Sequence, residues 1–152
     1  MTTIAWDGKR IAADRMCSIG NAPVRSPYPK IRRLVYKNLP AVMGTSGSVE
    51  YGHALMDWLQ AGAHAGKEPE LSNDVDSNYC MVLLATKDGV YLFSNSCVGV
   101  PLGVIPWAAG SGADYALGAM AAGACAKRAV EIAITLDVNS GCGVDVLRLG
   151  VK

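Results

Sequence analysis

The chain has 152 residues, a formal net charge of +1, and 51% hydrophobic but only 18% charged residues. This length suits a single domain over residues 1–152. The sequence lacks the clustered basic excess of nucleic-acid-binding proteins, the ~18-residue apolar run of a membrane span and the start of a signal peptide. We therefore expect a cytoplasmic protein with no nucleic-acid or membrane partner. The low charged fraction predicts that an oligomer hides part of its surface.

The first predicted element is a β-hairpin over residues 1–14. Two runs of strand-forming residues meet there at Asp7-Gly8, a dipeptide typical of a two-residue type I′ turn. The hairpin places Thr2 at the end of an ordered strand. Removal of Met1, which a small second residue permits, would give Thr2 a free α-amine with an ordinary pKa of roughly 7.7–8.0. That amine can act as the base for the Thr2 hydroxyl. Alternatively, Thr2 is only a β-branched residue at a strand start.

Loops, hairpins and helices follow along the rest of the chain. Ser48 is the predicted N-cap of the first helix, and glycine marks a break in the later helical region. The predicted elements are a loop over 18–29, a hairpin over 30–47, a helix over 48–61, a loop over 67–78, strands over 79–85 and 90–93, one or two strands over 98–109, helices within 113–136, a loop over 137–141 and a strand over 144–149. This order predicts an α+β fold in which two antiparallel sheets lie between helical layers.

The cysteines and histidines do not predict a metal or redox site. The five cysteines are widely spaced and include no C-x-x-C pair, so we interpret them as reduced thiols. His53, Asp57 and His64 fall on one side of an ideal helix, but Gly62 interrupts that helix before His64. With these two histidines on one segment, a Ser-His-Asp or Cys-His hydrolase is not favoured either.

Short polar motifs recur at the predicted strand ends and loops, where functional residues commonly lie. In chain order they are Thr2-Thr3, Ala12-Ala13-Asp14-Arg15, Lys30-Ile31-Arg32-Arg33-Leu34, Gly44-Thr45-Ser46-Gly47, Gly110-Ser111-Gly112 and Asp137-Val138-Asn139-Ser140-Gly141. In their order and local spacing they resemble the proteasome β-subunit family, the N-terminal-nucleophile threonine peptidases that include the HslV-type peptidase. The resemblance spans nearly the whole chain and implies a four-layer αββα sandwich. Because the chain is short between Gly44 and Ser111, one helix of one layer is expected to be shortened or missing.

The resemblance also implies roles for individual residues. Thr2 would be the nucleophile and, through its amine, the base. Lys30 would favour the unprotonated amine and the developing alkoxide, and Asp14 would keep Lys30 charged and oriented. The backbone N–H of Gly44 would be the oxyanion donor. The remaining polar positions would hold the amine and relay its proton: Ser111, Asp137 and Ser140.

Further implied features concern substrate, cations and assembly. Ser18 and Ser46 would contact an extended substrate strand, and Val42 would form the floor of the pocket for the side chain that precedes the cleaved bond. No cofactor is required, although main-chain carbonyls of Ile134, Asp137 and Ser140 would suit a structural monovalent or magnesium cation. The implied partners are a peptide or unfolded protein as substrate, other copies in a homo-oligomeric ring or double ring, and an ATP-dependent unfoldase.

Three functions remain open on the sequence alone. The first is a threonine-type peptidase that hydrolyses peptide bonds in a self-compartmentalising ring. The second is an N-terminal-nucleophile amidohydrolase that acts on a small amide, since the mechanism does not depend on what lies beyond the carbonyl. The third is a catalytically silent shell subunit with the same fold. Each residue also has a structural interpretation: Lys30 and Asp14 as a surface ion pair, Ser111 as a helix cap, and Asp137 with Ser140 as a turn.

Overall fold

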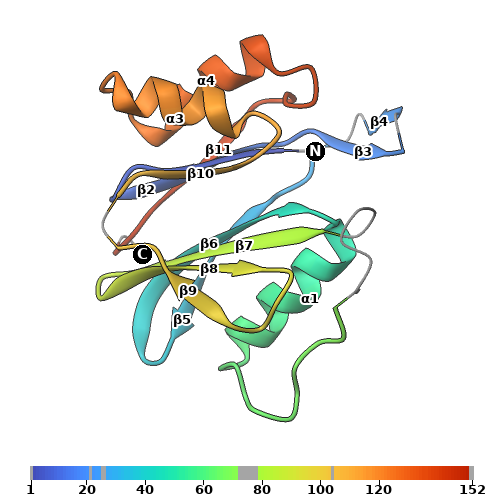
Figure 1. Ribbon diagram of the computed structural model, residues 1–152, viewed down its shortest axis with the longest axis vertical. Helices are drawn as coiled ribbons and strands as arrows, with labels where there is room; N and C mark the ends of the chain where they lie inside the picture. The colour runs from blue at the N-terminus through green and yellow to red at the C-terminus, as the bar shows by residue number, and fades with distance from the viewer. Residues whose placement is uncertain (1, 21, 25–26, 72–78, 104, 151–152) are drawn as a thin grey trace.

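The chain folds into four layers. The computed structural model describes residues 2–20, 22–24, 27–71, 79–103 and 105–150. Figure 1 shows helices α3 (Ala113–Ala121) and α4 (Ala126–Leu136) above a four-stranded sheet, which packs on a five-stranded sheet whose outer face carries α1 (Val49–Gln60). The predicted αββα sandwich is confirmed. No helix in the described part of the chain has the length and apolar character needed to cross a bilayer.

The four-stranded sheet contains both ends of the described chain. Its antiparallel strands lie in the order β10 (Trp107–Gly110), β1 (Thr3–Trp6), β2 (Arg10–Asp14) and β11 (Val144–Arg148). The predicted first hairpin is present, but its turn is centred one residue later than expected. The Asp7 carboxylate accepts hydrogen bonds from the N–H groups of Lys9 and Arg10 and so precedes the turn. Among the turn residues only Gly8 has a positive φ, which fits a type II′ turn rather than type I′.

The five-stranded sheet consists of the β5–β6 hairpin and the three successive strands β7–β9, and the segment that joins the two parts carries α1. Its antiparallel strands are, in spatial order, β5 (Ile31–Tyr36), β6 (Leu39–Gly47), β7 (Cys80–Thr86), β8 (Gly89–Ser94) and β9 (Gly99–Pro101). The turn between β5 and β6 has positive φ at both Lys37 and Asn38, as a type I′ turn requires. Within the predicted loop over 18–29, a separate ribbon pairs β3 (Cys17–Ile19) with β4 (Ala22–Val24). Pro23 is accommodated there because the ribbon has no central strand.

The helices begin and end close to the predicted positions. The Ser48 hydroxyl accepts a hydrogen bond from the Tyr51 N–H and caps α1, and Gly123, with a φ of +99°, lies in the break between α3 and α4. Residues 61–71 form no helix. The rest of the predicted loop, residues 72–78, lies outside the described residues.

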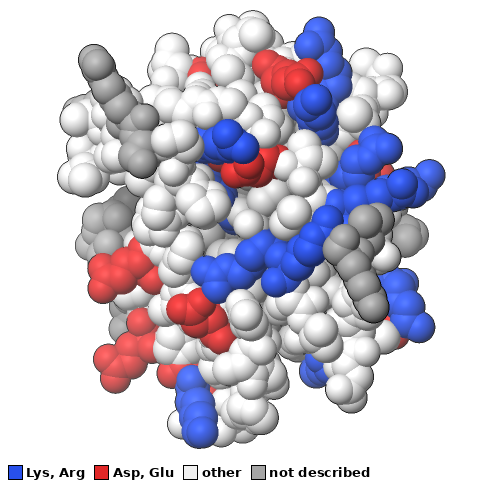
Figure 2. Space-filling view, turned by 180° about the vertical axis from the view of Figure 1, so that it is seen from behind, with Lys and Arg blue, Asp and Glu red and all other residues white. Residues whose placement is uncertain are grey.

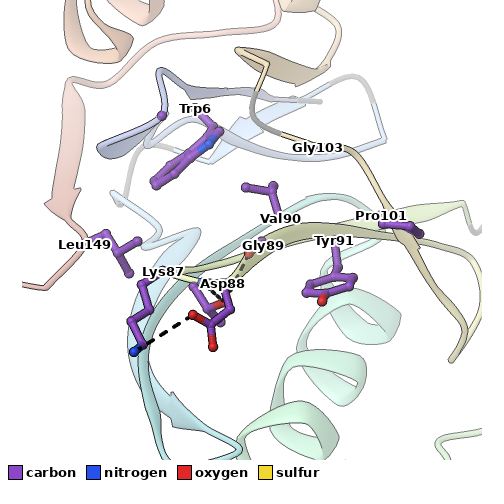
Figure 3. A pocket seen from close by; sticks show the side chains of 11 residues that line it. Trp6, Lys87, Asp88, Gly89, Val90, Tyr91, Pro101, Gly103 and Leu149 are labelled. Carbon is purple, nitrogen blue, oxygen red and sulfur yellow. Dashed lines mark hydrogen bonds and ion pairs between the residues drawn. The ribbon is translucent and has the colours of Figure 1, made fainter.

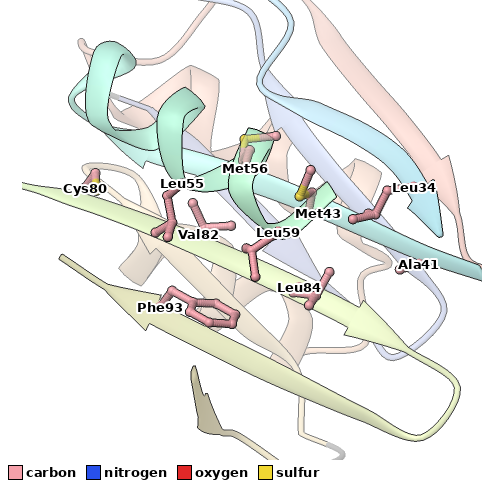
Figure 4. Close-up of a cluster of buried hydrophobic side chains, with 10 residues drawn as sticks. All are labelled: Leu34, Ala41, Met43, Leu55, Met56, Leu59, Cys80, Val82, Leu84 and Phe93. Carbon is pink, nitrogen blue, oxygen red and sulfur yellow. The ribbon is translucent and has the colours of Figure 1, made fainter. Parts of the chain in front are cut away.

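Three apolar layers hold the sandwich together. One lies between α1 and the five-stranded sheet, where Leu55, Met56 and Leu59 pack on Met43 and Leu84 (Figure 4). A second joins α3 and α4 to the four-stranded sheet and is dominated by alanine, so these helices approach the strands closely. The third fills the space between the two sheets. Its buried residues are Ile4, Trp6, Ile11, Ala13, Ile31, Val42, Leu83, Ala85 and Val90.

The charged side chains are unevenly distributed although the net charge is only +1. Figure 2 shows Lys and Arg gathered in a band across one face, with acidic side chains on both sides of it. The two sheets are also joined by a basic side chain, because Arg33 of β5 donates a hydrogen bond to the carbonyl of Arg148 at the end of β11.

Candidate active site

A buried carboxylate at the end of β2 organises the polar residues near the N-terminus. One Asp14 oxygen accepts hydrogen bonds from the Lys30 ammonium at 2.7 Å and from the Thr3 N–H at 2.9 Å. The other accepts from the N–H groups of Met16 at 3.1 Å and Gly141 at 2.9 Å. Asp14 is fully buried, so these four donors replace its lost hydration. Through these hydrogen bonds Asp14 connects β1, the residue just before β5 and the loop after α4.

Lys30 is a buried cation just before β5. It is 5% exposed and forms its ion pair with Asp14 away from solvent. Burial lowers the pKa of Lys30 and the charge of Asp14 raises it, with the net result that the pKa lies below its ordinary value of 10.5. The interpretation of Lys30 and Asp14 as a surface pair is therefore wrong. Lys30 instead presents a positive charge, held in a fixed place, whose proton is bound less tightly than in water.

A second carboxylate, Asp137, gathers hydroxyl groups beside the first one. One of its oxygens accepts hydrogen bonds from both Ser111 and Ser140, each at 2.6 Å. Burial raises the pKa of Asp137, but these hydroxyl donors and Asn139 outweigh it and leave the pKa below 3.8. Because Ser140 donates its only hydroxyl hydrogen to Asp137, the 2.7 Å contact between Ser140 and Thr3 must have Thr3 as donor.

Thr2 lies where these two groups meet. It is 3% exposed, its carbonyl oxygen lies 3.4 Å from the Ser111 hydroxyl oxygen, whose hydrogen is donated to Asp137, and the next residue, Thr3, is bonded to both Asp14 and Ser140. All the polar residues predicted to surround Thr2 are thus joined in one hydrogen-bonded set. They are Asp14, Lys30, Ser111, Asp137 and Ser140.

A small cavity of about 40 Å³ opens beside Thr2 and Lys30. Of the residues predicted to contact substrate, Ser18 and Ser46 line it. No role in the site was predicted from the sequence for several of the other lining residues, namely Met16, Cys17, Tyr28, Thr45 and Val49. Tyr28 lies between Pro27 and Pro29, which restrict the backbone there, and this was the available signal for a rigidly held side chain.

The structure corrects the predicted oxyanion donor. Gly44 lies in the core between the sheets, where a Cβ would come within 2.8 Å of Ile31 and 2.9 Å of Ile11. Since Thr45 donates its N–H to the Lys30 carbonyl, the Gly44 N–H faces the opposite edge of β6, where it pairs with Leu83 of β7. Gly44 therefore cannot present its N–H to Thr2.

Gly47 takes the position that Gly44 was expected to fill. It lines the cavity, and it lies two residues from Thr45, so its N–H leaves β6 on the same edge as that of Thr45. Strand β5 begins only at Ile31, so the strand partner on that edge has ended at this point. Of the two glycines in the Gly44–Gly47 segment, Gly47 is the one that lines the cavity with Thr2.

The predicted pocket floor is displaced for the same reason. Val42 is 1% exposed and packs in the core between the sheets, on the same face of β6 as Gly44. Thr45 is three residues further along and therefore on the opposite face, where it borders the cavity and packs against Gly52 of α1. Its hydroxyl is buried and has no hydrogen-bond partner among the described residues.

Behind Tyr28, a polar network connects the cavity wall to α1. Arg32 donates to Asp57 at 2.6 Å and to the Nδ1 of His53 at 3.0 Å, while His53 Nε2 lies 2.9 Å from the Tyr28 hydroxyl. Arginine only donates, so Nδ1 accepts, His53 is neutral and its Nε2–H donates to Tyr28. Burial and the neighbouring Arg32 both lower the pKa of His53, in agreement with this assignment. In the described part of the chain no cluster of His, Cys, Asp and Glu side chains is suited to a metal ion.

The fold is a sandwich of the N-terminal-nucleophile hydrolase type, and the residue just before its first strand, Thr2, lies in a buried polar centre. No protein-family model matches the sequence, and no curated protein shows significant similarity to it. Solved structures do match. HslV from Trypanosoma brucei is 21% identical with a TM-score of 0.68, and the alignment covers 97% of each chain.

Two further structures give the same result. BPH from Thiobacillus denitrificans, also solved in complex with epoxomicin, is 23% identical with a TM-score of 0.66 over 99% of each chain. Anbu, an ancestral beta-subunit from Yersinia bercovieri, is 13% identical with a TM-score of 0.71 over 98% of this chain and 82% of that one. These similarities establish the fold, and the predicted resemblance to HslV and proteasome β-subunits is confirmed at that level.

Proposed function

We propose that the protein is a threonine-type peptidase with Thr2 as its nucleophile. The observation that carries the proposal is the placement of buried Thr2 in one cavity with Lys30, whose charge is held by Asp14. The proposal requires cleavage of the Met1–Thr2 bond, because the nitrogen of Thr2 is a non-basic amide before cleavage. Met1 itself lies outside the described residues.

The reaction would proceed in two steps, formation of an ester on Thr2 and hydrolysis of that ester. The free α-amine of Thr2 takes the proton of its own hydroxyl, and the oxygen attacks the substrate carbonyl while Lys30 favours the developing alkoxide. The Gly47 N–H would donate to the resulting oxyanion. Collapse breaks the C–N bond, the protonated amine gives its proton to the leaving amine, and an ester on Thr2 remains. Water, deprotonated by the same amine, then hydrolyses the ester and restores Thr2.

The Asp137 cluster would hold the nucleophile in place. Ser140 accepts a hydrogen bond from the side chain of Thr3 and donates to Asp137. Ser111 also donates to Asp137 and lies 3.4 Å from the Thr2 carbonyl oxygen, so both serines would hold the backbone at the start of β1. A rigid backbone at this point keeps the amine and hydroxyl of Thr2 in reacting geometry. We assign these residues to positioning and proton relay.

The cavity beside Thr2 is small, about 40 Å³, and is bordered by Tyr28, which His53 holds. The same observation keeps hydrolysis of a small amide as a second candidate function. Fluorogenic peptides that differ only in the residue before the cleaved bond, compared with the corresponding simple amides, would separate the two.

We also propose that the active form is a homo-oligomeric ring. Two apolar side chains near the site are strongly exposed in the single chain, Ile19 at 78% and Val138 at 87%. Residue 138 belongs to the loop that carries Asp137 and Ser140, so an interface there would brace the site. Light scattering of the purified protein is expected to give a multiple of the 15.9 kDa chain mass. A monomer at micromolar concentration would contradict ring assembly while leaving the chemistry open.

The central test compares two adjacent threonines. Thr2→Ala is expected to abolish peptide hydrolysis, whereas Thr2→Ser keeps both hydroxyl and amine and retains measurable turnover. Thr3→Ser is the matched control, because it preserves the hydroxyl that donates to Ser140. Intact mass should show loss of Met1 and, after incubation with epoxomicin, an adduct on Thr2. Full activity of Thr2→Ala, or a mature chain that keeps Met1, would overturn the proposal and favour a silent subunit.

A further inference from the structure

Three arginines lie together at the edge of the sandwich where β5 meets β11. Arg10 of β2 and Arg148 of β11 are directly opposite each other, so their side chains leave the same face of the four-stranded sheet. Arg33 of β5 reaches across from the other sheet and donates to the Arg148 carbonyl at 2.6 Å. We call Arg10, Arg33 and Arg148 the arginine edge. Like charges directly opposite each other on neighbouring strands are destabilising, so this edge favours an anion beside it.

In the described part of the chain, Arg10 and Arg148 have no acidic partner. Neither forms an ion pair with a described residue. The carboxylates closest to them in sequence are already engaged, because Asp145 is paired with Arg15 and both oxygens of Asp7 accept backbone N–H groups. The edge therefore presents guanidinium groups, which bind carboxylates through paired N–H donors.

A segment elsewhere in the sequence has the opposite charge. Residues 68–76 include four acidic and no basic side chains. Glu68 and Glu70 are exposed and form no ion pair with a described residue, and the other two acidic positions lie outside the described residues. The segment follows α1, which covers the five-stranded sheet, whereas Arg10 and Arg148 belong to the other sheet (Figure 1). Glu68 and Glu70 thus do not compensate the arginine edge of their own chain.

The distribution of charge favours a second copy of the chain over an extended polyanion such as nucleic acid. Acidic side chains lie on both sides of the basic band, so a polyanion that covered this face would also meet like charges (Figure 2). The 14 basic and 13 acidic residues nearly cancel within one chain. Separate basic and acidic surfaces on an almost neutral chain suit a contact in which one copy supplies each sign.

We propose that the acidic segment 68–76 of one copy binds the arginine edge of the next copy. The inference rests on the proposed homo-oligomeric ring and assigns two of the surfaces that would join its members. Because the two surfaces are different parts of the chain, the contact is heterologous, and such a contact closes a ring when the rotation between copies permits. Neither surface includes a residue that lines the cavity beside Thr2.

The test reverses the charge of each surface and then mixes the two variants. The edge variant is Arg10→Glu/Arg148→Glu, and the segment variant replaces all four acidic residues of 68–76 with Lys. Each variant alone would bring like charges together, so the concentration at which half the protein is assembled should rise at least about tenfold. An equimolar mixture should assemble again, because every contact between the two variants joins opposite charges. Sedimentation velocity measures the assembled fraction.

Lys127→Glu/Arg128→Glu is the matched control. It changes the net charge as much as the edge variant does, but both side chains already have Glu131 as a partner on α4. It should assemble like the wild type and should not restore assembly of the segment variant. If the edge variant does not fold, Arg148→Glu alone takes its place.

Two results would separate this inference from the proposal on which it rests. If the wild type assembles and either reversed variant assembles equally well, or their mixture stays dissociated, the contact proposed here is wrong and the ring remains. A monomeric wild type would overturn both the ring and this contact. Neither result concerns the nucleophile, which the adduct on Thr2 tests separately.

Discussion

The two ends of strand β1 face opposite chemical environments. At its start, Thr2 and Thr3 meet two buried carboxylates whose oxygens are filled with donors, and the adjoining cavity is only about 40 Å³. At its end, Trp6 borders a mainly apolar cavity of about 340 Å³, which Figure 3 shows beside the β7–β8 turn. At the polar end both carboxylates have oxygens occupied by donors, whereas the other end is a larger and mainly apolar cavity.

If the proposed active site is correct, cavity size alone is a poor guide to it, because the smaller of these two cavities is the one beside Thr2. Chemistry at a nucleophile needs groups held in fixed positions by other groups, and dense hydrogen bonding leaves little empty space. The two ends should accordingly respond differently to the same kind of substitution.

The largest contrast is expected for removal of a lysine. Lys30→Met should lower peptidase activity by about 10²–10³-fold, because it removes the charge beside Thr2 and leaves the buried Asp14 carboxylate without its cation. Lys9→Met, at the exposed turn near Trp6, should leave activity unchanged. Turnover of a fluorogenic peptide measures both, with circular dichroism to confirm folding. Activity of a folded Lys30→Met protein within tenfold of the wild type would show that Lys30 has no part in the reaction.

The next contrast concerns two glycines with positive φ. Gly47, at +89°, would place a Cβ against the Tyr79 carbonyl, whereas Gly8, at +93°, has no described atom within 4 Å of its Cβ position. Gly8→Ala should lower the free energy of unfolding by about 1 kcal/mol through φ strain alone. Gly47→Ala should lower it by about 3 kcal/mol or more, since steric overlap with backbone is added. Urea denaturation measures both; similar losses would contradict the packing described around Gly47.

The smallest expected effect is a pH dependence confined to the polar end. The pKa of His53 lies below 6.5 in the folded protein because of burial and the nearby Arg32. Between that lowered pKa and 6.5, His53 is protonated more often in the unfolded chain than in the folded protein. The contribution of neutral His53 to the free energy of unfolding is therefore fully present above about pH 6.5, and it is lost as the pH falls through the lowered pKa. Protonation would also break the bond from Arg32 to Nδ1 and loosen Tyr28.

His53→Gln should therefore flatten the pH profile of stability between about pH 7 and pH 5. The matched control is His64→Gln, which should keep the wild-type profile because His64 lies outside α1 and outside this network. Thermal melts at several pH values suffice for the comparison. If the melting temperature of His53→Gln depends on pH as steeply as that of the wild type, neutral His53 does not stabilise the network with Arg32 and Tyr28.

Much of the fold was predictable because its signals are local. The Ser48 cap and the glycine break between the last two helices each act within a few residues, and the structure contains both. The polar residues around Thr2 were also identified in advance, because the order and spacing of their short motifs resemble the proteasome β-subunit family. The centre of the first turn was missed by one residue, because the Asp7 side chain competes for the backbone donors of the turn.

The sequence alone determined that two sheets would be covered by helices and that Thr2, Asp14, Lys30, Ser111, Asp137 and Ser140 were the polar candidates. Only the tertiary structure decided that Gly47 rather than Gly44, and Thr45 rather than Val42, border the cavity. Side chains and N–H groups alternate along a strand, so an error of three residues reverses the face. The correct face depends on how β6 pairs with β5 and β7, and those pairings connect residues far apart in the chain.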